Sequence, residues 1–129
     1  MSLDPRSAEP FDPARFLNYV RRVGHGGALG IAYHDHGEDW CTLSLPYDAR
    51  LVGMTESGVI ASGPIISLMD MATSIAIWVR IGRFRHQATL DMRVDYLRPA
   101  TPGRTLVGRG ECYAVTRSVG FVRATAHGG

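Results

Sequence analysis

The 129 residues are 45% hydrophobic and 20% charged, a balance typical of one globular domain with one core and unlike that of disordered or fibrous chains. The net charge of +2 is too small to indicate a nucleic-acid partner. No uninterrupted apolar run approaches the length of a membrane-spanning helix, and the first residues lack the basic and then apolar pattern of a signal peptide. We therefore expect a single cytoplasmic domain over 1–129 that binds neither nucleic acid nor a membrane.

The N-terminal third predicts one helix and two strands. Residues 1–10 are expected to form a flexible lead-in, because the stretch DPRSAEPFDP holds three prolines. A helix is expected over 11–23, since Asp12 suits the N-cap and Pro13 the first helical position. Its apolar residues fall on one face: Phe16, Leu17, Val20 and Val23. Glycines then end the helix, ALGIAYHDHG and DWCTLSLPYD predict two strands joined by a turn around HGED, and ARLVGMTESG predicts a loop.

The stretch SGPIISLMDMATSIAIWV predicts a long helix with its body over 65–80. Ser62 or Gly63 can cap it, and Pro64 suits its first turn. Because the body is apolar on nearly all sides, other elements should enclose it. Asp70 lies in the middle of this apolar run. A buried ionised carboxylate is so costly that it must be paired, neutralised or used in chemistry.

Three further strands are expected after this helix. QATLDMRVDYLRPA alternates strictly between apolar and polar residues, which predicts a half-buried strand. The turn TPGR separates it from the strand TLVGRGECYAVT, and VGFVRATAHG is the last strand. A single apolar helix between strands is best buried by wrapping an antiparallel sheet around it. The predicted fold class is therefore α+β.

Two long blocks, GVIASGPIISLMDMA and ATLDMRVDYLRPATPG, carry a resemblance to a known family. In their order and spacing, the chain from about Ala28 onward resembles the hotdog fold and, within it, the PaaI-type acyl-CoA thioesterases. The resemblance implies a hydrolase that converts an acyl-CoA thioester to a free acid and coenzyme A. It implies no cofactor apart from the coenzyme A of the substrate, and assembly as a homodimer or as a homotetramer built from two dimers.

The resemblance also implies roles for particular residues. Asp70 matches the aspartate that acts as general base on a water or attacks the thioester carbonyl directly. The carbonyl would be polarised by free N–H groups at the start of the same helix, here Ser62 and Gly63, contributed by the other subunit. Thr89 matches a hydroxyl residue that orients the water. Two stretches match the lining of the pantetheine and nucleotide path, with Arg98 and Arg117 as phosphate contacts: Tyr96, Leu97, Arg98, Pro99 and Ala100, and Val115, Thr116, Arg117 and Ser118.

The chain departs from the family pattern at three places. Ala61 stands where the family commonly has histidine, and Met54 and Thr55 stand where many members have an asparagine near the substrate carbonyl. The family also continues into one more strand beyond ATAHGG, so a truncated chain or a shortened sheet is expected. These departures leave a second function open, that of a non-catalytic acyl-CoA-binding sensor or carrier. A hotdog dehydratase is disfavoured, because no suitable pair of histidine and acid is present.

Other polar motifs suggest no further chemistry. GHGG at 24–27 looks like the family histidine motif, but we expect it to lead into a strand. The HDH stretch at 34–36 lacks a third ligand, so we expect no metal site. Ser62 lacks the G-x-S-x-G context of a nucleophile, and Cys41 and Cys112 suit small apolar positions in strands.

The polar face of the strand in QATLDMRVDYLRPA suggests self-association. Asp91, Arg93 and Asp95 alternate in sign along it. Antiparallel pairing with a second copy could place Arg93 opposite a partner carboxylate and join two small sheets into one.

Overall fold

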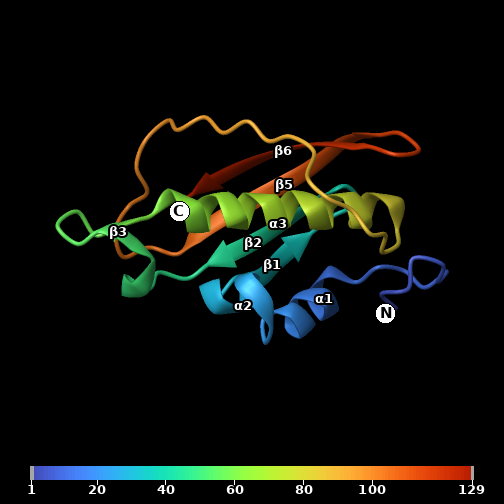
Figure 1. Ribbon diagram of the computed structural model, residues 1–129, viewed down its shortest axis with the longest axis horizontal. Helices are drawn as coiled ribbons and strands as arrows, with labels where there is room; N and C mark the ends of the chain where they lie inside the picture. The colour runs from blue at the N-terminus through green and yellow to red at the C-terminus, as the bar shows by residue number, and fades with distance from the viewer. Residues whose placement is uncertain (1, 129) are drawn as a thin grey trace.

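The computed structural model describes residues 2–128 and contains a four-stranded antiparallel sheet packed against one long helix, α3 (Figure 1). The sheet order is β1-β2-β5-β6, and a small separate ribbon pairs β3 with β4. The helices are α1 (Pro13–Val20), α2 (Gly24–Leu29), the short 3-10 helix η1 (Ala49–Leu51) and α3 (Ser62–Ile81). The strands are β1 (Ala32–His36), β2 (Trp40–Leu45), β3 (Val52–Met54), β4 (Val59–Ile60), β5 (Leu106–Val115) and β6 (Gly120–His127). The α+β fold predicted from the sequence is confirmed.

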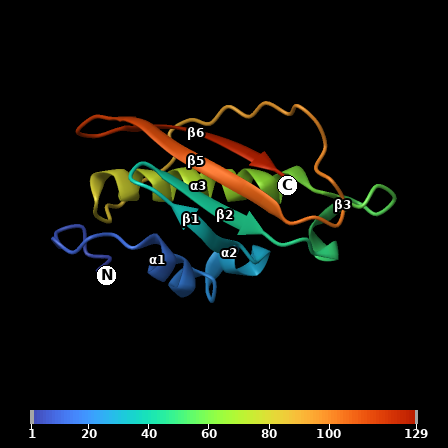
Figure 2. The ribbon, with the colours of Figure 1, turned by 180° about the vertical axis from the view of Figure 1, so that it is seen from behind.

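Close packing between α3 and β5 fixes the position of the helix. A Cβ atom at Gly110 would lie 2.5 Å from the backbone carbon of Ala72, and one at Gly108 would lie 2.8 Å from the side chain of Leu68. Glycine at both positions therefore allows helix and strand to approach closely. Seen from behind, β2 and β5 cross α3 along most of its length (Figure 2). By length and composition alone α3 could cross a membrane, but its buried residues place it in the core.

The N-terminal region follows the sequence prediction in one helix and departs from it in the next. The carboxylate of Asp12 accepts hydrogen bonds from the backbone N–H groups of Ala14 and Arg15, and Pro13 is the first residue of α1. The expected helix over 11–23 is shorter, since α1 ends at Val20. GHGG was expected to lead directly into a strand; it instead begins α2, where Gly26 packs without a side chain against Met71 of α3, and β1 begins only at Ala32.

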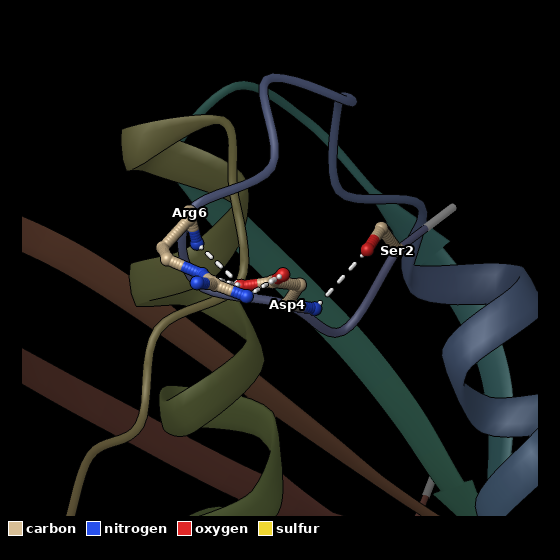
Figure 3. Close-up of polar contacts among 3 residues, drawn as sticks. All are labelled: Ser2, Asp4 and Arg6. Atoms are coloured by element: carbon tan, nitrogen blue, oxygen red, sulfur yellow. Dashed lines mark hydrogen bonds and ion pairs between the residues drawn. The ribbon is translucent and has the colours of Figure 1, made fainter.

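The lead-in passes the far end of α3. The backbone N–H of Phe11 donates to the carbonyl of Gly82, which follows the last turn of α3. In the same lead-in, the guanidinium of Arg6 pairs with the carboxylate of Asp4 at 3.0 Å, and the backbone N–H of Asp4 donates to the Ser2 hydroxyl (Figure 3). This bonding holds Asp4 in a pair with Arg6 and lowers the pKa of its carboxyl.

Two smaller predictions need correction. Neither Ser62 nor Gly63 caps α3; its N-cap is Ala61, which offers no side-chain hydrogen bond. The stretch expected to be a loop, ARLVGMTESG, contains η1 and β3. The first part of this stretch is ordered by Asp48, whose carboxylate accepts from the backbone N–H of Arg50 at 2.9 Å.

The strand expected in QATLDMRVDYLRPA is absent. The connecting segment between α3 and β5 (residues 82–105) contains no strand in the structure, although it runs back along α3 beside β6 (Figure 1). Two apolar residues of its central part are largely exposed, Leu90 at 82% and Leu97 at 91%, whereas Phe84 and Ala100 near its ends pack against the core. A strand needs a neighbouring strand to share its backbone hydrogen bonds, and no strand among residues 2–128 pairs with this segment.

Candidate active site

Asp70 occupies the middle of α3 and is half-buried at a groove of about 1630 Å³. Its Oδ1 atom accepts a hydrogen bond from the Thr89 hydroxyl at 2.8 Å. Within the described residues 2–128, the carboxylate forms no ion pair with an arginine. The sequence required this acid to be paired, neutralised or used in chemistry, and the structure shows that among these residues it is not paired with a cation. The carboxylate lines the groove and accepts a hydrogen bond from one hydroxyl donor, Thr89.

The connecting segment is held against α3 by three regularly spaced hydrogen bonds. The Trp78 indole N–H donates to the carbonyl of Arg85, the Gln87 amide donates to the carbonyl of Ser74, and Thr89 donates to Asp70. Each step is four residues back along the helix and two residues forward along the segment. Four helical residues rise about 6 Å and two extended residues about 6.6 Å, so the two spacings match. Thr89 is therefore placed at Asp70 by the register of the whole segment.

The groove lies between α3, the connecting segment and β6. The helix contributes one face, on which the lining residues recur about every four positions: Ile65, Met69, Asp70, Thr73, Ser74, Ile77 and Ile81. The end of β5 and the whole length of β6 form a second wall, including Tyr113, Val122 and Ala124. Asp70 thus lies on a mainly apolar surface that extends along the helix in both directions.

The backbone N–H groups expected to polarise the thioester carbonyl do not lie beside Asp70 of the same chain. Ser62 and Gly63 begin α3, are exposed, and do not line the groove. Gly63 is seven residues before Asp70, which corresponds to about 10 Å along the helix axis. A carbonyl attacked beside Asp70 could not also receive a hydrogen bond from these N–H groups. One chain therefore holds two separated parts of the expected site.

Both stretches expected to bind coenzyme A line the groove, but at opposite ends. Arg117 is next to the far end of α3, because its carbonyl accepts from the guanidinium of Arg85 at 3.3 Å. The stretch 96–100 lies near the start of α3, just before Pro102, which packs beside Gly58 in the turn that precedes this helix. Arg98 and Arg117 therefore cannot contact the same phosphate group within one chain.

The remaining polar motifs lie outside the groove. His25 of α2 hydrogen-bonds the Ser67 hydroxyl at 2.9 Å, and His34 and His36 bond Thr42 and Tyr33. Within residues 2–128 no group of three or more His, Cys, Asp or Glu side chains could hold a metal ion. Both cysteines are buried, as expected for small apolar positions. Burial raises the pKa of the Cys41 thiol to about 12, so this thiol stays protonated near neutral pH.

Comparison with known proteins identifies the family. Residues 57–129, more than half of the chain, match the family model described as "Thioesterase superfamily". The chain belongs to the thioesterase superfamily. The matched region begins before α3 and includes Asp70, Thr89 and both stretches that line the groove, so the family match covers the candidate site.

Individual relatives agree with this family assignment. The medium/long-chain acyl-CoA thioesterase YigI of Escherichia coli is 26% identical over 115 residues, which cover 78% of this chain and 68% of that protein. A solved Pseudomonas aeruginosa protein is 38% identical with a TM-score of 0.75, over 88% of this chain and 82% of that one.

Two solved structures with lower identity share the fold. A thioesterase of Haemophilus influenzae has a TM-score of 0.78 at 22% identity, over 92% of this chain and 80% of that one. The PaaI protein of Escherichia coli has a TM-score of 0.69 at 19% identity, over 88% and 79%. The hotdog fold implied by the resemblance is confirmed, and thioester hydrolysis is the chemistry of the family.

Sequence reasoning missed the groups that position the connecting segment. Trp78, Ser74, Arg85 and Gln87 were not singled out, because each type is ordinary at a core, surface or loop position. The signal that could have found them is the matched spacing of α3 and an extended segment running back along it. That signal becomes usable only once the segment is known to lie against the helix.

Proposed function

We propose that this protein hydrolyses an acyl-CoA thioester to a free acid and coenzyme A, with Asp70 activating the attacking water. The observation that carries the proposal is the half-buried Asp70 carboxylate, which lines an apolar groove and has a hydroxyl donor but no cationic partner among residues 2–128. Such a carboxylate is free to accept a proton, and the groove beside it has room for an elongated substrate. Membership of the thioesterase superfamily and the similarity to YigI support the same reaction.

The proposed reaction begins with a water held between the carboxylate of Asp70 and the hydroxyl oxygen of Thr89. Because the Thr89 hydrogen is donated to Asp70, its oxygen lone pairs can accept a hydrogen bond from that water. Asp70 takes a proton as the water oxygen bonds to the thioester carbonyl carbon. The tetrahedral intermediate then collapses, the carbon–sulfur bond breaks, and the departing thiolate of coenzyme A takes up the proton. Direct attack by Asp70 would instead form an anhydride that water hydrolyses in a second step.

The negative charge on the intermediate needs hydrogen-bond donors, and we propose that they come from a second copy of the chain. The free N–H groups at the start of α3 suit this charge but lie about 10 Å along the helix from Asp70 of their own chain. A second copy placed with its α3 start beside Asp70 would complete the site. Each dimer would then contain two equivalent sites.

Exposed apolar residues support the dimer. Leu90 and Leu97 are 82% and 91% exposed and Tyr96 is 63% exposed, all on the connecting segment. The outer edge of β6 pairs with no strand among residues 2–128. A second copy could cover these side chains and pair with the free edge of β6. Neither the apolar surface nor the unpaired backbone groups would then be exposed.

Free-thiol release from a panel of acyl-CoAs tests the proposal directly. We expect turnover of at least one straight-chain or aromatic acyl-CoA by the purified full chain. The alternative function, a sensor or carrier that binds acyl-CoA without hydrolysis, is favoured by Ala61, which leaves the N-cap of α3 without a side-chain donor or acceptor. Tight acyl-CoA binding with no thiol release across the panel would support that alternative and overturn the enzymatic proposal.

A further inference from the structure

A histidine of α2 reaches the helix that carries Asp70. The imidazole Nε2 of His25 lies 2.9 Å from the hydroxyl oxygen of Ser67 on α3, a hydrogen bond between residues 42 positions apart in the sequence. The next residue fixes α2 against α3, because a Cβ atom at Gly26 would lie 2.5 Å from the side chain of Met71. Figure 1 shows α2 beside the first half of α3, on the side opposite the connecting segment. The close approach at Gly26 therefore holds the imidazole beside α3.

The hydroxyl of Ser67 is used differently from those of Thr73 and Ser74. The latter two donate to the backbone carbonyl oxygen of Asp70, at 3.0 and 2.8 Å. Such bonds occupy the hydroxyl hydrogen within the helix. Ser67 instead bonds the ring of His25. When His25 carries its hydrogen on Nε2, the ring donates to Ser67, and the Ser67 hydrogen remains available for another acceptor.

Ser67 is a neighbour of Asp70 on the surface of α3. The two residues are three positions apart, so they project about 60° apart around the helix and lie about 4.5 Å apart along it. Side chains at this spacing have about 5–6 Å between their Cβ atoms. Asp70 lines the groove and is bonded by Thr89 from the connecting segment, whereas Ser67 lies just outside the groove lining and is bonded from α2. The two polar side chains therefore flank one part of the helix surface from opposite sides.

The space between Ser67 and Asp70 suits the reacting group of a thioester. A water bonded to Asp70 lies about 2.8 Å from the carboxylate, and the carbon that it attacks lies about 3–3.5 Å beyond the water. A carbonyl directed toward the start of α3 brings its oxygen within reach of the Ser67 hydroxyl, one turn before Asp70. The free N–H groups at the start of the same helix lie about 10 Å from Asp70 and cannot reach that oxygen.

We infer that Ser67 donates a hydrogen bond to the thioester carbonyl oxygen in the same chain as Asp70, and that His25 holds and polarises the Ser67 hydroxyl. As water attacks, negative charge collects on the carbonyl oxygen, and the Ser67 hydrogen bond strengthens without transfer of its proton. Ser67 is then a catalytic residue, and His25 is a positioning residue that acts through it. This donor adds to those proposed from a second copy. The inference rests on the proposed function, since it takes a thioester at Asp70 as the ligand.

Four variants test these roles by thiol release. Ser67→Ala should lower kcat about 100-fold with little change in KM, because the lost donor acts on charge that develops in the transition state. Alanine favours the helix, so this variant should stay folded. His25→Leu should lower kcat about tenfold, and His25→Gln should restore most of the rate, because its amide can donate to Ser67. The control is His34→Leu, since the exposed His34 also bonds a hydroxyl, that of Thr42 at 3.1 Å, but lies outside the groove.

His34→Leu should keep the wild-type kcat. An unchanged kcat in Ser67→Ala, or equal losses in His25→Leu and His34→Leu, would overturn the inference while leaving hydrolysis by Asp70 in place.

Infrared spectroscopy of a bound thioester separates the inference from the proposed function. The probes are octanoyl-CoA and benzoyl-CoA with carbon-13 at the carbonyl, bound to Asp70→Asn so that they are not turned over. We expect the carbonyl stretch at lower wavenumber in Asp70→Asn than in the double variant that also carries Ser67→Ala. That difference supports the inference even if the wild-type chain hydrolyses no thioester, and only the enzymatic proposal would then fail. The same wavenumber in both proteins, or binding of neither probe, would overturn the inference.

Discussion

The β5–β6 hairpin and the connecting segment run side by side, but only the hairpin forms strands. The hairpin pairs along its whole length from Val107–His127 to Val115–Gly120, although β6 alternates less strictly than the segment. The segment alternates strictly over 88–96 and stays unpaired, with Leu90 and Tyr96 exposed. Alternation therefore predicts which residues would share a face, whereas strand formation depends on a neighbour with free backbone groups.

The two regions also differ in how they are attached to α3. Glycines bring β5 against the helix backbone, so the hairpin belongs to the core. The segment contacts α3 through three hydrogen bonds that involve the side chains of Trp78, Gln87 and Thr89, and through the ring of Phe84, whose centroid lies 4.9 Å from that of Trp78. The hairpin accordingly belongs to the packed core, while the segment places the Thr89 hydroxyl at Asp70.

The largest effect on stability is expected in the hairpin. Gly110→Val places a side chain where a Cβ atom would already lie 2.5 Å from the backbone of Ala72, so α3 and β5 must separate. We expect a loss of about 3 kcal/mol in the free energy of unfolding, measured by urea denaturation. A change in the segment, Arg83→Ala, should cost less than about 0.5 kcal/mol, because Arg83 is exposed. Equal losses in the two variants would contradict the difference between the regions.

The next effect concerns association of two copies. The double variant Leu90→Arg with Leu97→Arg places charge on the apolar side chains proposed to meet a partner, and should raise the dimer dissociation constant by about 100-fold. Light scattering at micromolar concentration measures this as a shift from dimer to monomer mass. Tyr19→Arg, at a residue 61% exposed on α1, is the control and should leave the mass unchanged. A wild-type chain that is already monomeric under these conditions would refute the proposed dimer.

A smaller effect on activity is expected from Thr89. Thr89→Val keeps the shape of the side chain but removes the hydrogen bond to Asp70, so kcat should fall by about tenfold. Thr89→Ser retains the hydroxyl and should restore most of the rate. Since Thr89 is exposed, the urea midpoint should hardly move in either variant. The control Thr105→Val, at an exposed residue that does not line the groove, should leave the rate unchanged.

The smallest expected effect is on stability and comes from the exposed charged pairs of the two regions. Hydrogen bonds from Arg109 and then Arg123 lower the pKa of Glu111 on the hairpin, so its stabilising contribution is present above the ordinary carboxyl pKa of 4.5. This contribution is lost as the pH falls through the lower pKa of the folded state. The urea midpoint of Glu111→Gln should therefore be slightly below that of the wild type at pH 7, and the two should converge in acid. Asp95→Asn breaks only an exposed pair within the segment and should not change the midpoint at either pH.

Much of the fold could be predicted because its signals are local. The N-cap at Asp12, the apolar run of α3 and the turns around HGED and TPGR each depend on residues close in sequence. The short helix at GHGG could not be predicted in this way. It depends on Gly26 packing against Met71, a residue 45 positions later, and glycines by themselves indicate the end of a helix.

The residues of the candidate site could be named from the sequence, but their arrangement could not. Asp70 stands out as an acid in an apolar helix, and the resemblance to the family pointed to Thr89 as a residue of the same site. In the structure the Thr89 hydroxyl donates a hydrogen bond to Asp70. The separation of Arg98 from Arg117 could not be read from the sequence, because it depends on the direction in which the connecting segment returns along α3. The same holds for the distance between Asp70 and the start of its helix.

The most direct test of the catalytic role is the turnover of Asp70→Asn, measured as free-thiol release per folded molecule beside its unfolding free energy. The substitution keeps the shape of the side chain but removes its negative charge and basicity. We expect the rate to fall by roughly two to four orders of magnitude. We expect stability to be unchanged or higher, since no arginine among residues 2–128 loses an ion-pair partner. Asp91→Asn, an exposed acid lining the same groove, is the control and should keep the wild-type rate. An Asp70→Asn protein with wild-type turnover per folded molecule, whatever its stability, would contradict the catalytic assignment.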